Sequence, residues 1–318
     1  MRHALALLVL VLSSAAAGAQ SFPGKPVRLL VGYPPAGPAD FTARLLAAGL
    51  QEHWGSPVVV ENRPGASAMI AADIVARAAP DGYTLLLGTI QSHAMNIGSI
   101  KKLLYDPVRD FTAISQVTRA KWALAANADV RARTLQDLIA TARGRPGELN
   151  YGSSGIGGVS HLAFEMFSAT LGLSLTHIPY KGTAQAVADV VDGRVHLVIA
   201  DQPTLAPHIQ SGRLVVLATT GSERSAALAQ LPALAEVAAG FDVQPWQGLF
   251  GPAGLPAGLA QKVSTDVAAV LRRPELQEKL AAAGIEAAAS TPELFAAHVR
   301  REVERWTAAA RSAGIQPE

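Results

Sequence analysis

The stretch Asn150-Tyr151-Gly152-Ser153-Ser154-Gly155-Ile156-Gly157-Gly158-Val159-Ser160-His161 joins a predicted strand to a predicted helix through a loop of small residues. The strand ends at Tyr151, and the apolar spacing predicts a helix from Val159 to Leu171. A loop of this kind leaves unpaired backbone N–H groups at a helix N-terminus, where the helix dipole favours negative charge. Ser153 and Ser154 add hydroxyl groups, and the glycines let a ligand approach the backbone. We therefore predict half of a carboxylate-binding site here.

Other interpretations of this stretch are weaker or simpler. Ser and Gly also cap and bend ordinary strand-to-helix turns, and that structural interpretation stays open at this point. The glycine pattern from Gly155 to Ser160 lacks the third glycine of a dinucleotide fingerprint. The serines also miss the Gly-x-Ser-x-Gly spacing of a nucleophile elbow. A hydrolase that uses Ser153 or Ser154 with His161 is therefore only a remote alternative.

The same alternation of strand and helix runs through both halves of the chain. Apolar, β-rich runs bounded by Gly and Pro predict strands, and the segments between them carry helical spacing. Parallel pairing with right-handed crossovers follows from the order βαβαβ. The predicted strands outside the opening stretch are Val27–Tyr33, Pro57–Glu61, Tyr83–Gly88, Leu175–Tyr180, Val195–Ala200 and Leu214–Thr219.

The length of the mature chain predicts two lobes, because roughly 300 residues exceed one ordinary core. Two long β-rich stretches, Phe111–Ala126 and Val243–Gly251, are expected to cross between the lobes. Lobe 1 would then be discontinuous, formed by residues 20–122 and 244–318, and lobe 2 would span 123–243. The predicted fold class is α/β, with each lobe a mostly parallel sheet flanked by helices.

Residues 1–19 have the features of an export signal. A short basic start precedes an apolar run from Ala4 to Leu12, and Ala17-Gly18-Ala19 offers a cleavage site. We expect a soluble periplasmic protein after cleavage near Ala19, although the signal alone would also suit full secretion. The chain has no cysteine, and 27 basic residues nearly balance 25 acidic ones. Without a basic patch or metal-ligand spacing, nucleic-acid binding and a metal site are not expected.

Several motifs, taken together, resemble one family throughout nearly the whole mature chain. Their order and spacing resemble those of the periplasmic solute receptors of tripartite tricarboxylate transporters, the Bug family. The motifs that carry the resemblance are Pro34-Pro35-Ala36-Gly37-Pro38-Ala39-Asp40, Val58-Val59-Val60-Glu61-Asn62-Arg63-Pro64-Gly65-Ala66, Pro80-Asp81-Gly82-Tyr83-Thr84-Leu85-Leu86, Tyr105-Asp106-Pro107 with Asp110-Phe111, Tyr151 to His161, His177-Ile178-Pro179-Tyr180-Lys181-Gly182 and Trp246-Gln247-Gly248.

The resemblance implies a two-lobed periplasmic binding protein of type II that encloses a small organic acid between its lobes. It implies no catalysis and no cofactor, a membrane transporter as partner, and an acid held by backbone N–H groups, hydroxyls and waters. We expect a monomer. A sensory receptor that docks on a membrane kinase is an alternative that the sequence cannot separate. The predicted ligand-binding residues are Pro35, Ala36, Gly37, Ala39, Asp40, Gly65, Ala66, Ser67, Ala68, Gln91, Ser153, Ser154, Gly157, Gly158, His161, Tyr180 and Asp201.

Some of these residues also have a structural interpretation. Asp40 would be unfavourable beside an anion and is favoured to order its own loop. His161 is favoured as a neutral ring bonded to the loop, and Asp201 as a helix cap unless the ligand is neutral or carries an amine. The family usually has Thr where this chain has Ala39, and Gly-Gly where it has Ser67-Ala68. These departures leave the fold secure and the identity of the ligand open.

Overall fold

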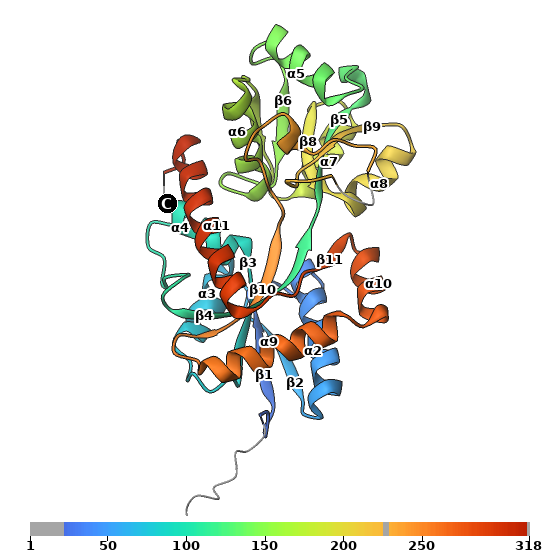
Figure 1. The fold of residues 1–318 in the computed structure, drawn as a ribbon. Coiled ribbons are helices and arrows are strands. Elements are labelled where there is room, and N and C mark those ends of the chain that lie inside the picture. The colour runs from blue at the N-terminus through green and yellow to red at the C-terminus, as the bar shows by residue number, and fades with distance from the viewer. Residues whose placement is uncertain (1–21, 225–228, 317–318) are drawn as a thin grey trace, which may run out of the picture.

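The computed structural model of the protein describes residues 22–224 and 229–316 and shows two α/β lobes placed end to end (Figure 1). The predicted signal, residues 1–19, lies outside the described residues. Within the described ranges, no helix is both long and apolar enough to cross a membrane.

The first sheet is mixed. Its described strands, in spatial order, are β11 (Ile285–Ala287), β4 (Phe111–Ala120), β10 (Trp246–Pro252), β3 (Thr84–Thr89), β1 (Val27–Val31) and β2 (Val58–Asn62). Strand β1 pairs in parallel with both β2 and β3, as the βαβαβ pattern predicts. Strand β10 runs antiparallel to β3 and β4, and β11 runs antiparallel to β4.

The second sheet is built in a similar way. Its described strands, in spatial order, are β7 (Thr176–Pro179), β6 (Asn150–Ser153), β8 (Leu197–Asp201), β5 (Trp122–Asn127) and β9 (Leu214–Thr219). The β6 strand pairs in parallel with β7 and β8, whereas β5 is antiparallel to β8 and β9. Because β6 and β8 run in parallel, their carboxyl ends open on the same edge of the sheet.

Helices cover both faces of each sheet. The first-lobe helices flank the β1 sheet, and α5 to α8 flank the β6 sheet (Figure 1). The longer described helices are α2 (Pro38–Trp54), α3 (Met69–Ala76), α5 (Leu135–Gly144), α6 (Val159–Leu171), α7 (Thr183–Val191), α8 (Gln202–Gln210), α9 (Ala257–Leu271), α10 (Pro274–Ala282) and α11 (Pro292–Ser312). Short turns of helix are η2 (Ala66–Ala68), η3 (Gln91–Met95), α4 (Asn96–Ser99), η4 (Ala128–Val130) and η6 (Leu234–Glu236).

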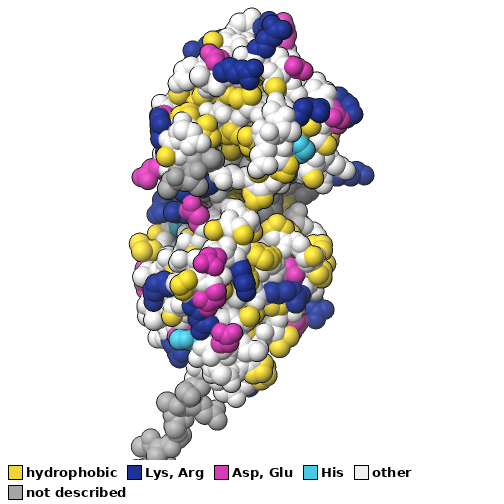
Figure 2. Space-filling model, turned by 90° about the vertical axis from the view of Figure 1, so that its right-hand side faces the viewer, with side chains coloured by type: hydrophobic (Ala, Val, Ile, Leu, Met, Phe, Trp, Pro, Cys, Tyr) yellow, Lys and Arg dark blue, Asp and Glu magenta, His cyan; other side chains and the backbone are white. Residues whose placement is uncertain are grey.

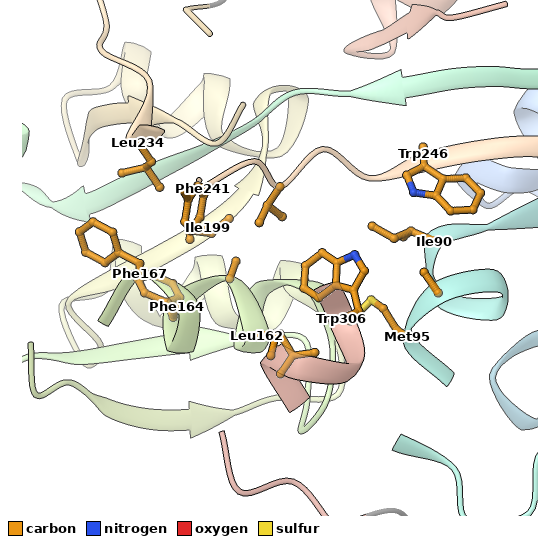
Figure 3. Packing of buried hydrophobic residues seen from close by; sticks show 14 of the residues in the cluster. Ile90, Met95, Leu162, Phe164, Phe167, Ile199, Leu234, Phe241, Trp246 and Trp306 are labelled. Carbon is orange, nitrogen blue, oxygen red and sulfur yellow. The ribbon is translucent and has the colours of Figure 1, made fainter. Parts of the chain in front are cut away.

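The chain passes from one sheet to the other at Lys121, between β4 and β5. It returns through the segment before β10. One hydrophobic cluster continues across this junction, where Trp306 lies between Ile90 of the first lobe and Leu162 of the second, with Trp246 beside Ile90 (Figure 3). The last helix, α11, supplies Trp306 and therefore packs against both lobes.

The predicted two-lobed α/β architecture is confirmed. Both sheets are mixed rather than mostly parallel, because β4, β10 and β11 of the first sheet and β5 of the second form antiparallel pairs. Helix α6 and strand β9 have the predicted bounds. The opening strand runs on to Ser153 rather than ending at Tyr151, so the loop behind it is shorter than predicted. Strand β6 is longer than predicted because its parallel pairing with β7 continues to Ser153 and Pro179. The three-residue strand β11 was not predicted, since its sequence is alanine-rich and short.

Candidate ligand-binding site

The first candidate loop lies between β1 and α2. Pro38 begins α2, as its fixed φ favours, and Ala36 has a positive φ of 66°. The Asp40 carboxylate is buried and faces its own loop: it accepts hydrogen bonds from Ala36 N at 3.0 Å, Arg44 Nε at 2.8 Å and Asn62 Nδ2 at 2.9 Å. These bonds, that from Arg44 above all, lower the pKa of Asp40 to about 2. The carboxylate thus has the structural role that the sequence favoured, while Pro35 and Ala36 are exposed.

The second candidate loop, Gly65–Ala68, joins β2 to α3 in a left-handed conformation. Ala66, Ser67 and Ala68 have φ values of 45°, 53° and 69°. The left-handed conformation costs a residue with a Cβ atom about 1–2 kcal/mol of conformational energy. Gly65, Ala66 and Ser67 are exposed, and Ala68 is buried. Solvent therefore reaches a strained backbone at this loop.

These two loops meet at the carboxyl ends of β1 and β2. Asn62, the last residue of β2, donates from Nδ2 to Asp40 of the first loop at 2.9 Å and to the carbonyl oxygen of Tyr33 at 3.0 Å. Gly32 lies so close to Ala68 that a Cβ atom on Gly32 would be 2.3 Å from Cβ of Ala68. Only glycine fits at position 32, because real Cβ atoms do not approach so closely. The structure thus brings residues 35–40 and 65–68 together.

The loop of the second lobe contains Ser153 and Ser154, which have different surroundings. Ser153 is buried; its Oγ accepts a hydrogen bond from Gly155 N at 3.1 Å and lies 2.6 Å from His177 Nε2. Ser154 is partly exposed, and Ser160 Oγ accepts a hydrogen bond from its backbone N–H at 3.0 Å. Ser154 is thus the more exposed residue of the two, and its Oγ lies 3.3 Å from Ser160 Oγ.

Two stacked imidazoles support this loop from behind. The rings of His161 and His177 lie 3.9 Å apart with an interplanar angle of 14°. Nδ1 of His161 accepts a hydrogen bond from Gly157 N at 3.1 Å, so that nitrogen carries no proton. Burial lowers the pKa of His161, and it lowers that of His177 to about 4. His161 therefore has the neutral, loop-bonded role that the sequence favoured.

Three other predicted residues bond within the protein. The Tyr180 hydroxyl donates to Asp189 at 2.7 Å, and its ring packs behind Gly152. Asp201 caps α8 by accepting from Thr204 N at 2.9 Å. Gln91 donates to Asn96 Oδ1 at 2.9 Å. Asp201 nevertheless ends β8, beside the end of β6, so it lies at the same edge of the sheet as Ser153.

The helices at the candidate loops begin without side-chain caps. Gly37, Ala68 and Gly158 precede α2, α3 and α6, and none of the three makes a side-chain cap bond. The first residue of α2 is a proline without an N–H group, and the first N–H of α3, that of Met69, bonds the carbonyl oxygen of Ala66. Helices α5, α8 and α11 are capped by Thr or Asp, although α7, α9 and α10 also start uncapped. Uncapped N–H groups at a helix start favour an anion, since the dipole adds to the hydrogen bonds.

The lobes approach each other on both sides of the junction. A Cβ atom on Gly157 would lie 3.7 Å from Cβ of Ser99, at the end of α4. A Cβ atom on Gly284, just before β11, would lie 2.6 Å from Cδ of Pro203 in α8. Between the two lobes the molecule narrows to a waist (Figure 2). The second-lobe loop therefore lies close to the first lobe.

Two cavities lie away from these loops. One of about 350 Å³ adjoins the start of α11 and Phe111, and another of about 470 Å³ lies between α6 and α11. None of the predicted ligand-binding residues lines either cavity. The described residues also contain no group of three or more His, Asp or Glu side chains placed to hold a metal ion.

Some supporting residues were not found from sequence. His177 and Asn96 contact the candidate loops from 24 and 29 residues away in the chain, bonding Ser153 and Ser67. The His177-Ile178-Pro179-Tyr180 motif carried the family resemblance, but nothing in its spacing indicated a pair with Ser153. Ser153 lies buried in this pair, and the partly exposed Ser154 bonds Ser160 rather than His161, so neither serine is paired with His161 as a nucleophile would be.

Comparison with known proteins identifies the family. Residues 42–315 match the model of the tripartite tricarboxylate transporter family receptor, TctC. Protein BugT of Bordetella pertussis (strain Tohama I) is 32% identical over 305 residues, which cover 95% of this chain and 94% of BugT. A Pseudomonas sp. (strain P51) protein, described by its place in the tcbD-tcbE intergenic region, is also 32% identical, over 96% of this chain and 92% of its own.

Solved structures agree with this assignment. An R. palustris protein solved with adipate is 37% identical, with a TM-score of 0.77 over 93% of this chain and all of its own. MatC from Rhodopseudomonas palustris, solved with bound malate, is 29% identical, with a TM-score of 0.71 over 91% of this chain and all of its own. BugD, a periplasmic binding protein, is 32% identical, with a TM-score of 0.73 over 93% of this chain and all of its own. The chain therefore belongs to the TctC/Bug family, whose members are non-enzymatic periplasmic solute receptors of tripartite tricarboxylate transporters.

Proposed function

We propose that the protein binds a small dicarboxylate between its lobes and delivers it to a tripartite tricarboxylate-type membrane transporter. One carboxylate would face the first-lobe loops, residues 35–40 and 65–68, and the other the second-lobe loop, residues 153–158. The proposal includes export to the periplasm after cleavage near Ala19. It also includes lobe boundaries at 20–122 plus 244–318 and at 123–243.

The observation that carries the proposal is the placement of uncapped helix starts on both lobes. Helices α2 and α3 begin at the carboxyl ends of β1 and β2, and α6 begins just beyond β6. Open α/β sheets bind ligands at this edge. Two anion-favouring loops on two lobes fit a ligand with two acidic ends better than a ligand with one.

The charges at the loops support binding through the backbone. The Arg44 guanidinium already has partners, because its Nε donates to Asp40 and its Nη2 donates to Asn62 Oδ1. Arg63 pairs with Glu61. A carboxylate here would therefore depend on N–H groups, the Ser154 hydroxyl and bridging waters. The relatives solved with adipate and with malate support a dicarboxylate as the ligand class.

Titration calorimetry with matched ligands tests this function. The mature protein would be titrated with succinate, malate and adipate, and with hexanoate as a monocarboxylate of the same chain length as adipate. Losing charge-assisted hydrogen bonds worth about 1.5–3 kcal/mol weakens binding at least tenfold, so hexanoate should bind that much more weakly than the best dicarboxylate. Every ligand should be recovered unchanged. Equal affinity for hexanoate and adipate, or turnover of any ligand, would contradict the proposal.

A further inference from the structure

The strained backbone conformation at Ser67 and Ala68 must be stabilised by contacts with other residues. Both residues have left-handed φ values, which a residue with a Cβ atom adopts only when its surroundings impose them. The loop is short and exposed as far as Ser67. Contacts from elsewhere in the fold must therefore supply the constraint.

The contact to the middle of the loop comes from Asn96. This residue is completely buried, and its Nδ2 donates to the carbonyl oxygen of Ser67 at 3.0 Å. Its Oδ1 accepts from Gln91 Nε2 at 2.9 Å. A carbonyl can only accept and an amide nitrogen can only donate, so these two bonds fix the orientation of the Asn96 amide. Gln91, which the sequence predicts to touch the ligand, also helps to orient Asn96.

The same short helix also reaches the opposite lobe. Asn96 begins α4, and Ser99 ends it beside Gly157 of the second-lobe loop. This short turn thus bonds the first-lobe loop through Asn96 and lies next to the second-lobe loop at Ser99. We propose that Asn96 is a positioning residue of the ligand site, which holds the Gly65–Ala68 loop in its anion-binding shape and in register with Gly157. This inference rests on the proposed function.

A double-mutant cycle tests the role of Asn96. Asn96→Ala should weaken binding of the preferred dicarboxylate, with adipate and malate as probes, by about tenfold, the effect of losing one buried hydrogen bond. In a background carrying Ser67→Gly and Ala68→Gly, the same change should cost less than threefold, because glycine adopts positive φ without strain. Equal losses in both backgrounds, or no loss in either, would overturn the inference.

Asn127→Ala is a matched control. Asn127 is buried in the second lobe, where its Nδ2 donates to Val190 O at 2.7 Å, so it makes the same kind of bond away from the loops. Its removal should lower the melting temperature and leave the affinity of the folded protein within twofold. A loss of affinity as large as that of Asn96→Ala would show a general effect of destabilisation and overturn the inference.

A measurement without ligand separates this inference from the proposed function. Hydrogen exchange of the backbone amides in residues 65–70 should speed up in Asn96→Ala and stay unchanged in Asn127→Ala. Unchanged exchange in Asn96→Ala would overturn the positioning role even if dicarboxylates bind. Failure of the folded wild-type protein to bind any dicarboxylate would instead overturn the proposed function, and with it the role of Asn96 in binding.

Discussion

The Oε2 atom of Glu302 accepts a hydrogen bond from Nε1 of Trp246 at 3.0 Å, and this bond ties α11 to β10 at the junction of the lobes. The same oxygen accepts from Trp306 Nε1 at 3.1 Å, and all three side chains are buried. Trp306 in turn packs within the cluster that spans both lobes (Figure 3). The Glu302 carboxylate therefore links helix α11 to the junction of the lobes.

Removal of this carboxylate should destabilise the protein strongly. Glu302→Ala leaves two buried indole N–H groups without an acceptor, at about 1–3 kcal/mol each. We expect a loss of about 2–5 kcal/mol in the free energy of unfolding, measured by urea denaturation followed by tryptophan fluorescence. Glu304→Ala, on the exposed face of the same helix, is the control and should change stability by less than about 0.5 kcal/mol. Similar effects of the two changes would contradict this role.

Ser154 should supply a hydroxyl to the ligand. Ser154→Ala is expected to weaken dicarboxylate binding about ten- to a hundredfold, because a charge-assisted hydrogen bond is worth about 1.5–3 kcal/mol. The melting temperature of the ligand-free protein should hardly change, since the loop hydroxyl supports little of the core. Ser153→Ala should show the opposite pattern, because its Oγ is buried against His177. Unchanged affinity in Ser154→Ala would remove the hydroxyl from the proposed site.

The stacked imidazoles should make stability fall in mild acid. Their folded pKa values lie below the ordinary value of 6.5, that of His177 at about 4, so the unfolded chain binds more protons. The stability that these two neutral imidazoles contribute is complete above about pH 6.5, and it is lost as the pH falls from there through their folded pKa values. Melting temperatures measured from pH 7.5 to 4.5 should follow this course.

A non-titrating substitution isolates the contribution of His161. In His161→Asn the amide oxygen can replace Nδ1 as the acceptor for Gly157 N–H, and it gains no proton in acid. This variant should lose less melting temperature than wild type between pH 7.5 and 4.5. An identical pH profile would show that His161 does not contribute to the acid sensitivity.

Ligand binding should close the two lobes around the junction. The segments at Lys121 and before β10 are the places where the chain passes between the sheets. A hinge movement there would reduce the radius of gyration modestly. Small-angle scattering with and without saturating dicarboxylate measures this change, and hexanoate serves as the control. An unchanged radius with a ligand that calorimetry shows to bind would contradict closure.

Local signals in the sequence were enough to predict most of the helices and strands. The spacing of apolar residues predicted the bounds of α6, and Thr134 and Asp137, at the sequence spacing of a capping box, do form one at the start of α5. Strand β11 escaped prediction because its pairing to β4 depends on a segment some 170 residues earlier in the chain. Strand pairing of this kind is a tertiary effect that overrides local propensity.

The candidate site was predictable in outline and less so in detail. Glycine and proline at the ends of strands indicated the loops, since these residues suit turns and uncapped helix starts. The left-handed shape of Ser67 and Ala68 was not predictable, because their residue types disfavour it and Asn96 contacts the loop only in the fold. The same holds for His177, whose bond to Ser153 joins two neighbouring strands.

A crystal structure of the mature protein with its preferred dicarboxylate is the most direct test of the central claim. We predict one carboxylate within hydrogen-bond distance of backbone N–H groups in residues 35–40 or 65–68. The other should lie against residues 153–158, with Ser154 Oγ as a donor. A ligand held instead in the cavity between α6 and α11, or touching only one lobe, would contradict the account.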